Sequence, residues 1–136
     1  MSHTNYNAYA ATLLRVSLGI LFLAHGLLKV FVFTPAGTAG FFASLGLPGW
    51  LAYPTIAAEV GGGLLLIAGL YSRQVSLALV PVLLGAIFFA HLDAGWLFSN
   101  EGGGWEFPAF WAVTLFVQAL LGDGAYALSS VFRRNN

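Results

Sequence analysis

Four long apolar stretches, separated by short polar or glycine-rich connections, dominate the chain. Each has about the 17–25 residues that a helix needs to cross a lipid bilayer. We predict transmembrane helices over residues 10–33, 51–70, 75–92 and 105–121. Pro81 lies inside the third stretch and should kink that helix, because proline lacks a backbone donor. The pattern predicts an all-α membrane protein, a four-helix bundle that forms a single domain over residues 1–136.

The connection between the first two stretches is unusual. It contains the apolar run Ala39-Gly40-Phe41-Phe42-Ala43-Ser44-Leu45-Gly46. This run is too short to cross a membrane and too apolar for an ordinary loop. We therefore predict a short interfacial or re-entrant helix between spans one and two.

Composition agrees with a membrane location. Hydrophobic residues make up 59% of the chain and charged residues only 7%, against about 25% charged in a typical soluble domain. The net charge is zero and no basic cluster occurs, which argues against nucleic acid as a partner. The absence of cysteine excludes disulfides and thiolate metal sites.

The few charges between the spans predict an orientation. Four spans place both termini on one side, where Arg73, Arg133 and Arg134 also lie, whereas the opposite loops carry Asp93 and Glu101. Positive residues favour the cytoplasmic side, so we predict that both termini are cytoplasmic. All four tryptophans should then lie at or near the outer interface, as an aromatic belt: Trp50, Trp96, Trp105 and Trp111.

Glu59 interrupts the second stretch near its middle, about 12 Å below one face of a hydrocarbon core roughly 30 Å thick. An unpaired charge there costs at least about 2.5–3.5 kcal/mol, which marks Glu59 as a candidate functional residue. His25 on the first span should lie at the same depth. Lys29, His91 and Glu106 should surround the space above them, towards the outer face. We predict that these five residues line an outward-opening, ligand-binding pocket within the bundle.

Helical phase places the charges of the first span on one side. At about 100° per residue, Lys29 and His25 lie within about 80° of Arg15, and Gly19 and Gly26 lie close to the Arg15 direction. This face should point into the bundle. Small residues four positions apart, which permit close helix packing, recur in the second span at Ala57–Gly61 and Ala58–Gly62.

Each candidate also has a structural interpretation. Glu59 could form an ion pair with Lys29 or with Arg15, and Lys29 could instead extend to the outer headgroups. We interpret Arg15 as an interface anchor or as a structural ion-pair partner. His25 and His91 suit hydrogen-bonded bundle histidines better than metal or haem ligands, so we predict no metal site.

An ordered set of segments resembles the DoxX family. These segments are Leu14–Lys29, Phe41–Pro48, Glu59–Leu64, Gly69–Arg73, Gly103–Phe107 and Leu121–Ser129. The resemblance implies a compact four-helix bundle in the bacterial cytoplasmic (inner) membrane. Some members of the family are subunits of thiosulfate:quinone oxidoreductases, and others accompany redox-stress or detoxification systems.

The pocket and the resemblance together lead to a functional hypothesis. We expect a redox-linked membrane subunit whose Glu59 and His25 bind the polar head of a quinone or a similar amphipathic molecule. The chain has no self-sufficient catalytic or intrinsic cofactor motif, so an oxidoreductase partner subunit would supply the rest. Two alternatives stay open: a non-catalytic partner or assembly factor of an oxidoreductase or stress-response complex, and a small-solute transporter. Glycine-rich helix faces would also suit a homo-oligomer.

Overall fold

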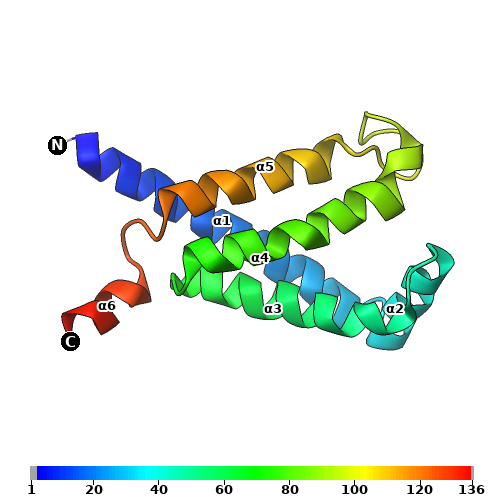
Figure 1. The fold of residues 1–136 in the computed structure, drawn as a ribbon, viewed down its shortest axis with the longest axis horizontal. Helices are drawn as coiled ribbons and strands as arrows, with labels where there is room; N and C mark the ends of the chain where they lie inside the picture. Colours follow the sequence, from blue (N-terminus) through cyan, green and yellow to red (C-terminus); the bar gives the residue numbers. More distant parts are fainter. Residues whose placement is uncertain (1–2, 136) are drawn as a thin grey trace.

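A computed structural model describes residues 3–135, which contain helices and no β-strand. Four of the helices run side by side along the molecule: α1 (His3–Phe31), α3 (Ala52–Ala68), α4 (Ser72–Gly85) and α5 (Glu106–Leu121) (Figure 1). A short helix lies near each end of this bundle, α2 (Pro35–Ser44) and α6 (Leu128–Arg134). Both chain termini lie at the end that carries α6 (Figure 1). The predicted all-helical fold is confirmed.

Three segments are long and apolar enough to cross a membrane. They run over Asn5–Phe31, Gly49–Ala68 and Ser72–Ala94 and contain 27, 20 and 23 residues. The fourth predicted span, α5, is apolar but has 16 residues, which corresponds to a length of about 24 Å. The helix predicted there is confirmed, and by its length alone it is shorter than the usual requirement for a span.

The predicted short helix between the first two spans is confirmed as α2. Pro35 occupies its first turn, where the missing N–H has no partner to lose. The Thr34 Oγ1 atom accepts a hydrogen bond of 3.1 Å from the Gly37 N–H and caps the helix. α2 contacts the start of α3. It therefore covers one side of the bundle at the end away from the termini.

The third predicted span is less regular than a single helix. Pro81 lies inside α4, and the chain then forms a π-helical turn over Ala86–His91 followed by a 3₁₀ turn over Leu92–Ala94. A π-helical turn contains more than four residues, so it rotates the following side chains relative to a regular α-helix. The position of His91 depends on this turn.

α1 and α3 pack in backbone contact through glycine. A methyl group on Gly19 would come within 2.8 Å of the Gly63 carbonyl oxygen, and one on Gly63 would come within 2.7 Å of the Leu23 nitrogen. Gly26 is similarly close to the Val60 side chain. The predicted inward-facing stripe of the first span is therefore confirmed, and α3 is its partner.

Arg15 forms no ion pair among residues 3–135, which was one of the two interpretations of this residue. The Arg15 side chain is 1% exposed and donates its hydrogen bonds to backbone carbonyl oxygens instead. Five carbonyls accept them, those of Leu66, Ile67, Asp123, Ala125 and Tyr126, at 2.7–3.4 Å. Helix ends leave carbonyls without intrahelical partners, and Arg15 supplies donors to them. It thereby connects α1 to the end of α3 and to the segment that precedes α6.

The side chain of Trp111 is buried within the bundle. Trp111 is 7% exposed and packs against Phe22, with the ring centroids 4.6 Å apart. It lies on the face of α5 that also buries Ala112 and Leu115, so its side chain points into the bundle. Trp50 and Trp96 are more than half exposed, as expected for a belt.

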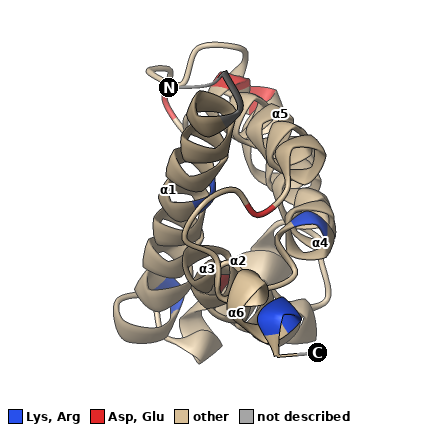
Figure 2. Ribbon diagram, turned by 90° about the vertical axis from the view of Figure 1, so that its left-hand side faces the viewer, with Lys and Arg blue, Asp and Glu red and all other residues tan. Residues whose placement is uncertain are grey.

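α6 was not predicted from the sequence, and a carboxylate anchors its seven residues. The Ser129 Oγ atom donates a hydrogen bond of 2.6 Å to Asp123 Oδ2, and Arg133 lies 3.3 Å from the same oxygen. Figure 2, viewed from this end, shows basic positions on α6 and at the start of α4. Basic residues thus gather at the end of the bundle that carries the termini.

We predict that alanine substitution lowers the stability of the protein at one glycine of α3 but not at a neighbouring one. Gly63→Ala should lower the melting temperature of the purified protein by several degrees, because its methyl group would force the α1 and α3 backbones apart, at a cost of about 1–3 kcal/mol. Gly61→Ala is the matched control, since nothing lies within 4 Å of a methyl group there. Equal melting temperatures for the two variants would contradict this packing.

We also predict that acid releases α6. Burial opposes ionisation of Asp123, but hydrogen bonds, including that from Ser129, and the charge of Arg133 hold the pKa of its carboxyl below the ordinary value. The resulting stabilisation is complete above the unfolded pKa of about 3.9 and is lost as the pH falls through the folded pKa. Hydrogen-exchange protection of the α6 amides should therefore decrease below about pH 4. Asp123→Asn should already show low protection at pH 7, and full protection in that variant would refute the anchor.

Candidate functional site

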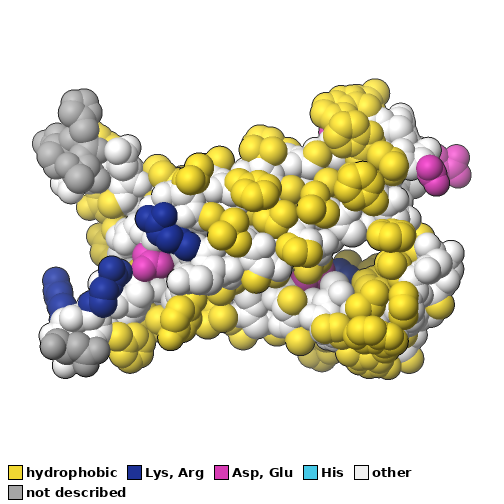
Figure 3. All heavy atoms as spheres, in the orientation of Figure 1, with side chains coloured by type: hydrophobic (Ala, Val, Ile, Leu, Met, Phe, Trp, Pro, Cys, Tyr) yellow, Lys and Arg dark blue, Asp and Glu magenta, His cyan; other side chains and the backbone are white. Residues whose placement is uncertain are grey.

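A cavity of about 750 Å³ lies in the bundle at the end that carries α2. Its size is within the range of about 300–1,000 Å³ that is usual for small-molecule sites. All the long helices and α2 contribute to its wall, which is mainly apolar and aromatic. Figure 3 shows a hollow beside α2 in which acidic and basic atoms are visible. The charged side chains that line the cavity are Lys29 and Glu59.

Lys29 and Glu59 form an ion pair between α1 and α3. The Lys29 Nζ atom lies 2.9 Å from Glu59 Oε2 and 3.1 Å from Glu59 Oε1. The side chains are 20% and 6% exposed, respectively. Of the partners considered for Glu59, the structure selects Lys29, whose side chain lines the cavity. Pairing removes most of the cost of placing a carboxylate inside an apolar bundle.

Both predicted histidines line the same cavity. The His25 Nδ1 atom is 2.8 Å from the Leu21 carbonyl oxygen, and the His91 Nδ1 atom is 2.7 Å from the Gly103 carbonyl oxygen. The His25 ring also lies against Trp111, with centroids 4.8 Å apart. Among residues 3–135, no three histidine or carboxylate side chains gather as a metal site would require.

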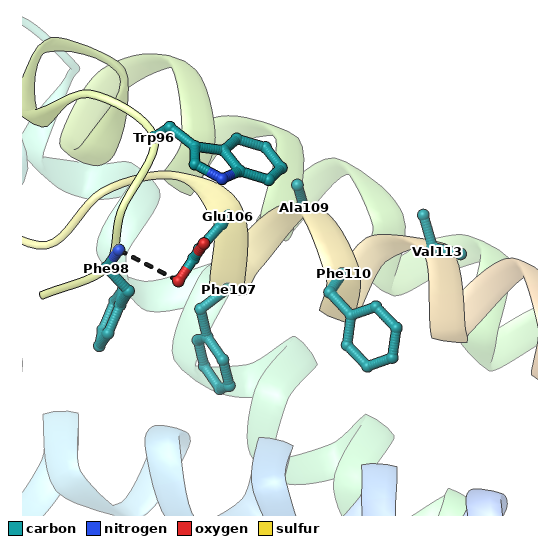
Figure 4. Close-up of a pocket in the computed structure, with 7 residues that line it drawn as sticks. All are labelled: Trp96, Phe98, Glu106, Phe107, Ala109, Phe110 and Val113. Carbon is teal, nitrogen blue, oxygen red and sulfur yellow. Dashed lines mark hydrogen bonds between the residues drawn. The ribbon is translucent and has the colours of Figure 1, made fainter.

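Glu106 lies apart from the other four candidates. It lines a second, shallower hollow of about 630 Å³ on the outer side of α5. Its Oε1 atom accepts a hydrogen bond of 3.3 Å from the Phe98 N–H, and the Trp96 ring lies over it (Figure 4). Phe98 and Phe107 line both hollows and separate them. The structure therefore brings together His25, Lys29, Glu59 and His91, and it does not place Glu106 with them.

Sequence reasoning missed the aromatic side chains of the cavity. Trp111 lines it together with Phe107, one helical turn earlier, and their ring centroids are 5.8 Å apart. The i, i+4 spacing of these two residues was the available signal, since such residues share a helix face. The remaining aromatic residues of the wall come from several elements and carry no common spacing: Phe33, Phe41, Phe42, Phe89 and Phe98.

Comparison with known proteins identifies the family. The sequence profile of the DoxX family matches residues 10–92, which is more than half of the chain. The chain belongs to the DoxX family. Because three of its helices are also long and apolar enough to span a bilayer, this DoxX protein is a membrane protein.

Two relatives are similar to this DoxX protein over most of their length. A Bacillus subtilis (strain 168) protein named "Putative oxidoreductase CatD" is 39% identical over 116 residues, which are 85% of this chain and 81% of the relative. An uncharacterized protein of Haemophilus influenzae (strain ATCC 51907 / DSM 11121 / KW20 / Rd) is 31% identical over 128 residues, or 93% of each chain. No solved structure matches the chain.

We predict strong coupling between Lys29 and Glu59 in the stability of this DoxX protein. Lys29→Met should lower its melting temperature markedly, because it leaves a buried carboxylate unpaired at a cost on the order of 3 kcal/mol. The double variant Lys29→Met/Glu59→Gln should recover most of the loss, because no buried charge remains. Thermal unfolding of both single variants and the double variant measures the coupling. Additive effects of the two substitutions would contradict the ion pair.

Proposed function

We propose that this DoxX protein is a redox-linked subunit that binds a quinone, or a similar amphipathic molecule, in the cavity around Lys29 and Glu59. The observation that supports the proposal most is the placement of an ion pair and two histidines inside one largely apolar cavity. An amphipathic ring compound would contact both these polar groups and the apolar wall. Its polar oxygens would meet the charged and imidazole groups, and its ring and tail would meet the aromatic wall.

The proposal includes a membrane arrangement. In our proposal α5 crosses the membrane as a fourth span, since a helix of about 24 Å can be accommodated by local thinning of a core of about 30 Å. The α6 end, with Arg73 and Arg133, faces the cytoplasm of a bacterial inner membrane according to the positive-inside rule. The cavity, at the opposite end, would then lie towards the outer leaflet. A lipid-soluble ligand could reach it from the membrane.

The redox role rests on the family and on one named relative. A protein 39% identical to this chain is named as an oxidoreductase, and quinones are lipid-soluble redox carriers. The chain has no cysteine for a thiol or iron–sulfur centre, and its described residues supply groups that can bind a ligand and exchange protons. We therefore propose that a partner subunit of a membrane oxidoreductase supplies the electron transfer, and that this chain supplies the ligand site.

Ligand binding by matched variants tests the proposal. Purified protein should bind a short-chain benzoquinone, detected by quenching of tryptophan fluorescence, because Trp111 lines the cavity. Glu59→Gln should weaken binding about tenfold or more, because the Lys29 ammonium group, which would donate to a quinone oxygen, loses the carboxylate that holds it in the cavity wall. Glu106→Gln is the control, since Glu106 lines the other hollow, and it should bind like the unaltered protein. Absence of saturable binding, or equal loss in both variants, would contradict the site.

A further inference from the structure

The hydrogen bonds of the two cavity histidines fix where their protons lie. The Nδ1 atoms of His25 and His91 each contact a backbone carbonyl oxygen, at 2.8 and 2.7 Å. A carbonyl oxygen can only accept a hydrogen bond, so each Nδ1 atom must carry the hydrogen. In the neutral ring the other nitrogen, Nε2, is then a hydrogen-bond acceptor. Within residues 3–135, no protein group donates to either Nε2 atom.

The same cavity also offers a donor. The Lys29 ammonium group has three N–H bonds, and two of them can donate to the two oxygens of Glu59, so one N–H remains for a ligand. A ligand in the cavity therefore meets two imidazole acceptors and an ammonium donor.

This mixture of donors and acceptors discriminates between the two redox forms of a quinone. A quinone oxygen can only accept, so it would leave the imidazole Nε2 acceptors without partners inside a largely apolar cavity. A hydroxyl group donates one hydrogen bond and accepts others, so it can satisfy an Nε2 atom and a donor together. Sites built around polar groups reject analogues that leave those groups unpaired.

We infer that the cavity selects the reduced, hydroxylated form of its ligand: a quinol, or another aromatic ring with two hydroxyl groups and an apolar substituent. This inference rests on the proposed function, because it names the form of the molecule that occupies the same cavity. It assigns His25 and His91 as the residues that determine this specificity. Lys29 serves either form, because both forms accept hydrogen bonds.

Three probes of one ring system test the selection. A decyl-substituted benzoquinol, its quinone and its bis-O-methyl ether are titrated anaerobically into the full-length protein in detergent micelles. The quinol should bind about tenfold or more tightly than the quinone. The ether, which has the same ring and tail but no hydroxyl hydrogen, should bind no better than the quinone. A quinone that binds as tightly as the quinol would overturn the inference while leaving the proposed site intact, and absence of binding by all three would overturn both.

Histidine variants assign the effect to the Nε2 atoms. His25→Leu and His91→Leu should each weaken quinol binding and leave quinone binding nearly unchanged. The ratio of the quinone Kd to the quinol Kd should therefore fall towards one. His91→Gln carries an oxygen acceptor in place of the Nε2 atom and should retain part of the preference. An undiminished preference in both leucine variants would overturn the assignment.

A measurement on the unaltered protein covers the case in which a variant fails to fold. In ¹⁵N-histidine spectra, the Nε2 resonances of His25 and His91 should have the chemical shift of an unprotonated nitrogen and move when the quinol is added. Protonated Nε2 atoms in the free protein, or resonances that the quinol leaves unmoved, would contradict the inference.

Discussion

The hydrogen bonds of Arg15 are the interaction on which the rest of the structure depends. One buried guanidinium donates to five backbone carbonyls, from the end of α3 and from the segment between α5 and α6. In an apolar surrounding, carbonyls at helix ends need donors from within the protein. Arg15 therefore satisfies the backbone of two distant segments at once. It also fixes the middle of α1 relative to the end of α3.

The cavity follows from this fixed pair of helices. One turn after Arg15 along α1, Gly19 packs against Gly63 and allows the two backbones to touch. Further towards the end of α1, Lys29 pairs with Glu59 of α3. The hydrogen bonds of Arg15 and the Lys29–Glu59 pair thus lie on either side of this close packing along the two helices. α4 and α5 complete the bundle around the ion pair, and α2 covers its side. The cavity is the space that these elements leave around the two charges and the two histidines.

The features that could be predicted from the sequence are those that depend on composition and helical phase. The apolar stretches predicted the four long helices, and the cost of a buried carboxylate identified Glu59 before any partner was known. The partners of Arg15 could not be predicted, because they are backbone carbonyls and any residue type provides one. The π-helical turn before His91 and the inward direction of Trp111 depend on packing between α4 and α5. Glu106 lies at the expected end of α5, but its side chain points to another side of the helix. The sequence does not determine how a helix is rotated about its own axis.

The cavity as a ligand site is the central claim, and an experimental density map tests it most directly. The protein would be prepared in lipid nanodiscs with a benzoquinol under anaerobic conditions and its structure determined at a resolution that shows ring shapes. We expect ring-shaped density within the cavity, in contact with the Lys29–Glu59 pair and with hydroxyl positions within hydrogen-bond distance of the His25 and His91 Nε2 atoms. A cavity closed by collapsed aromatic side chains, or filled by a lipid chain while the quinol lies elsewhere, would contradict the account.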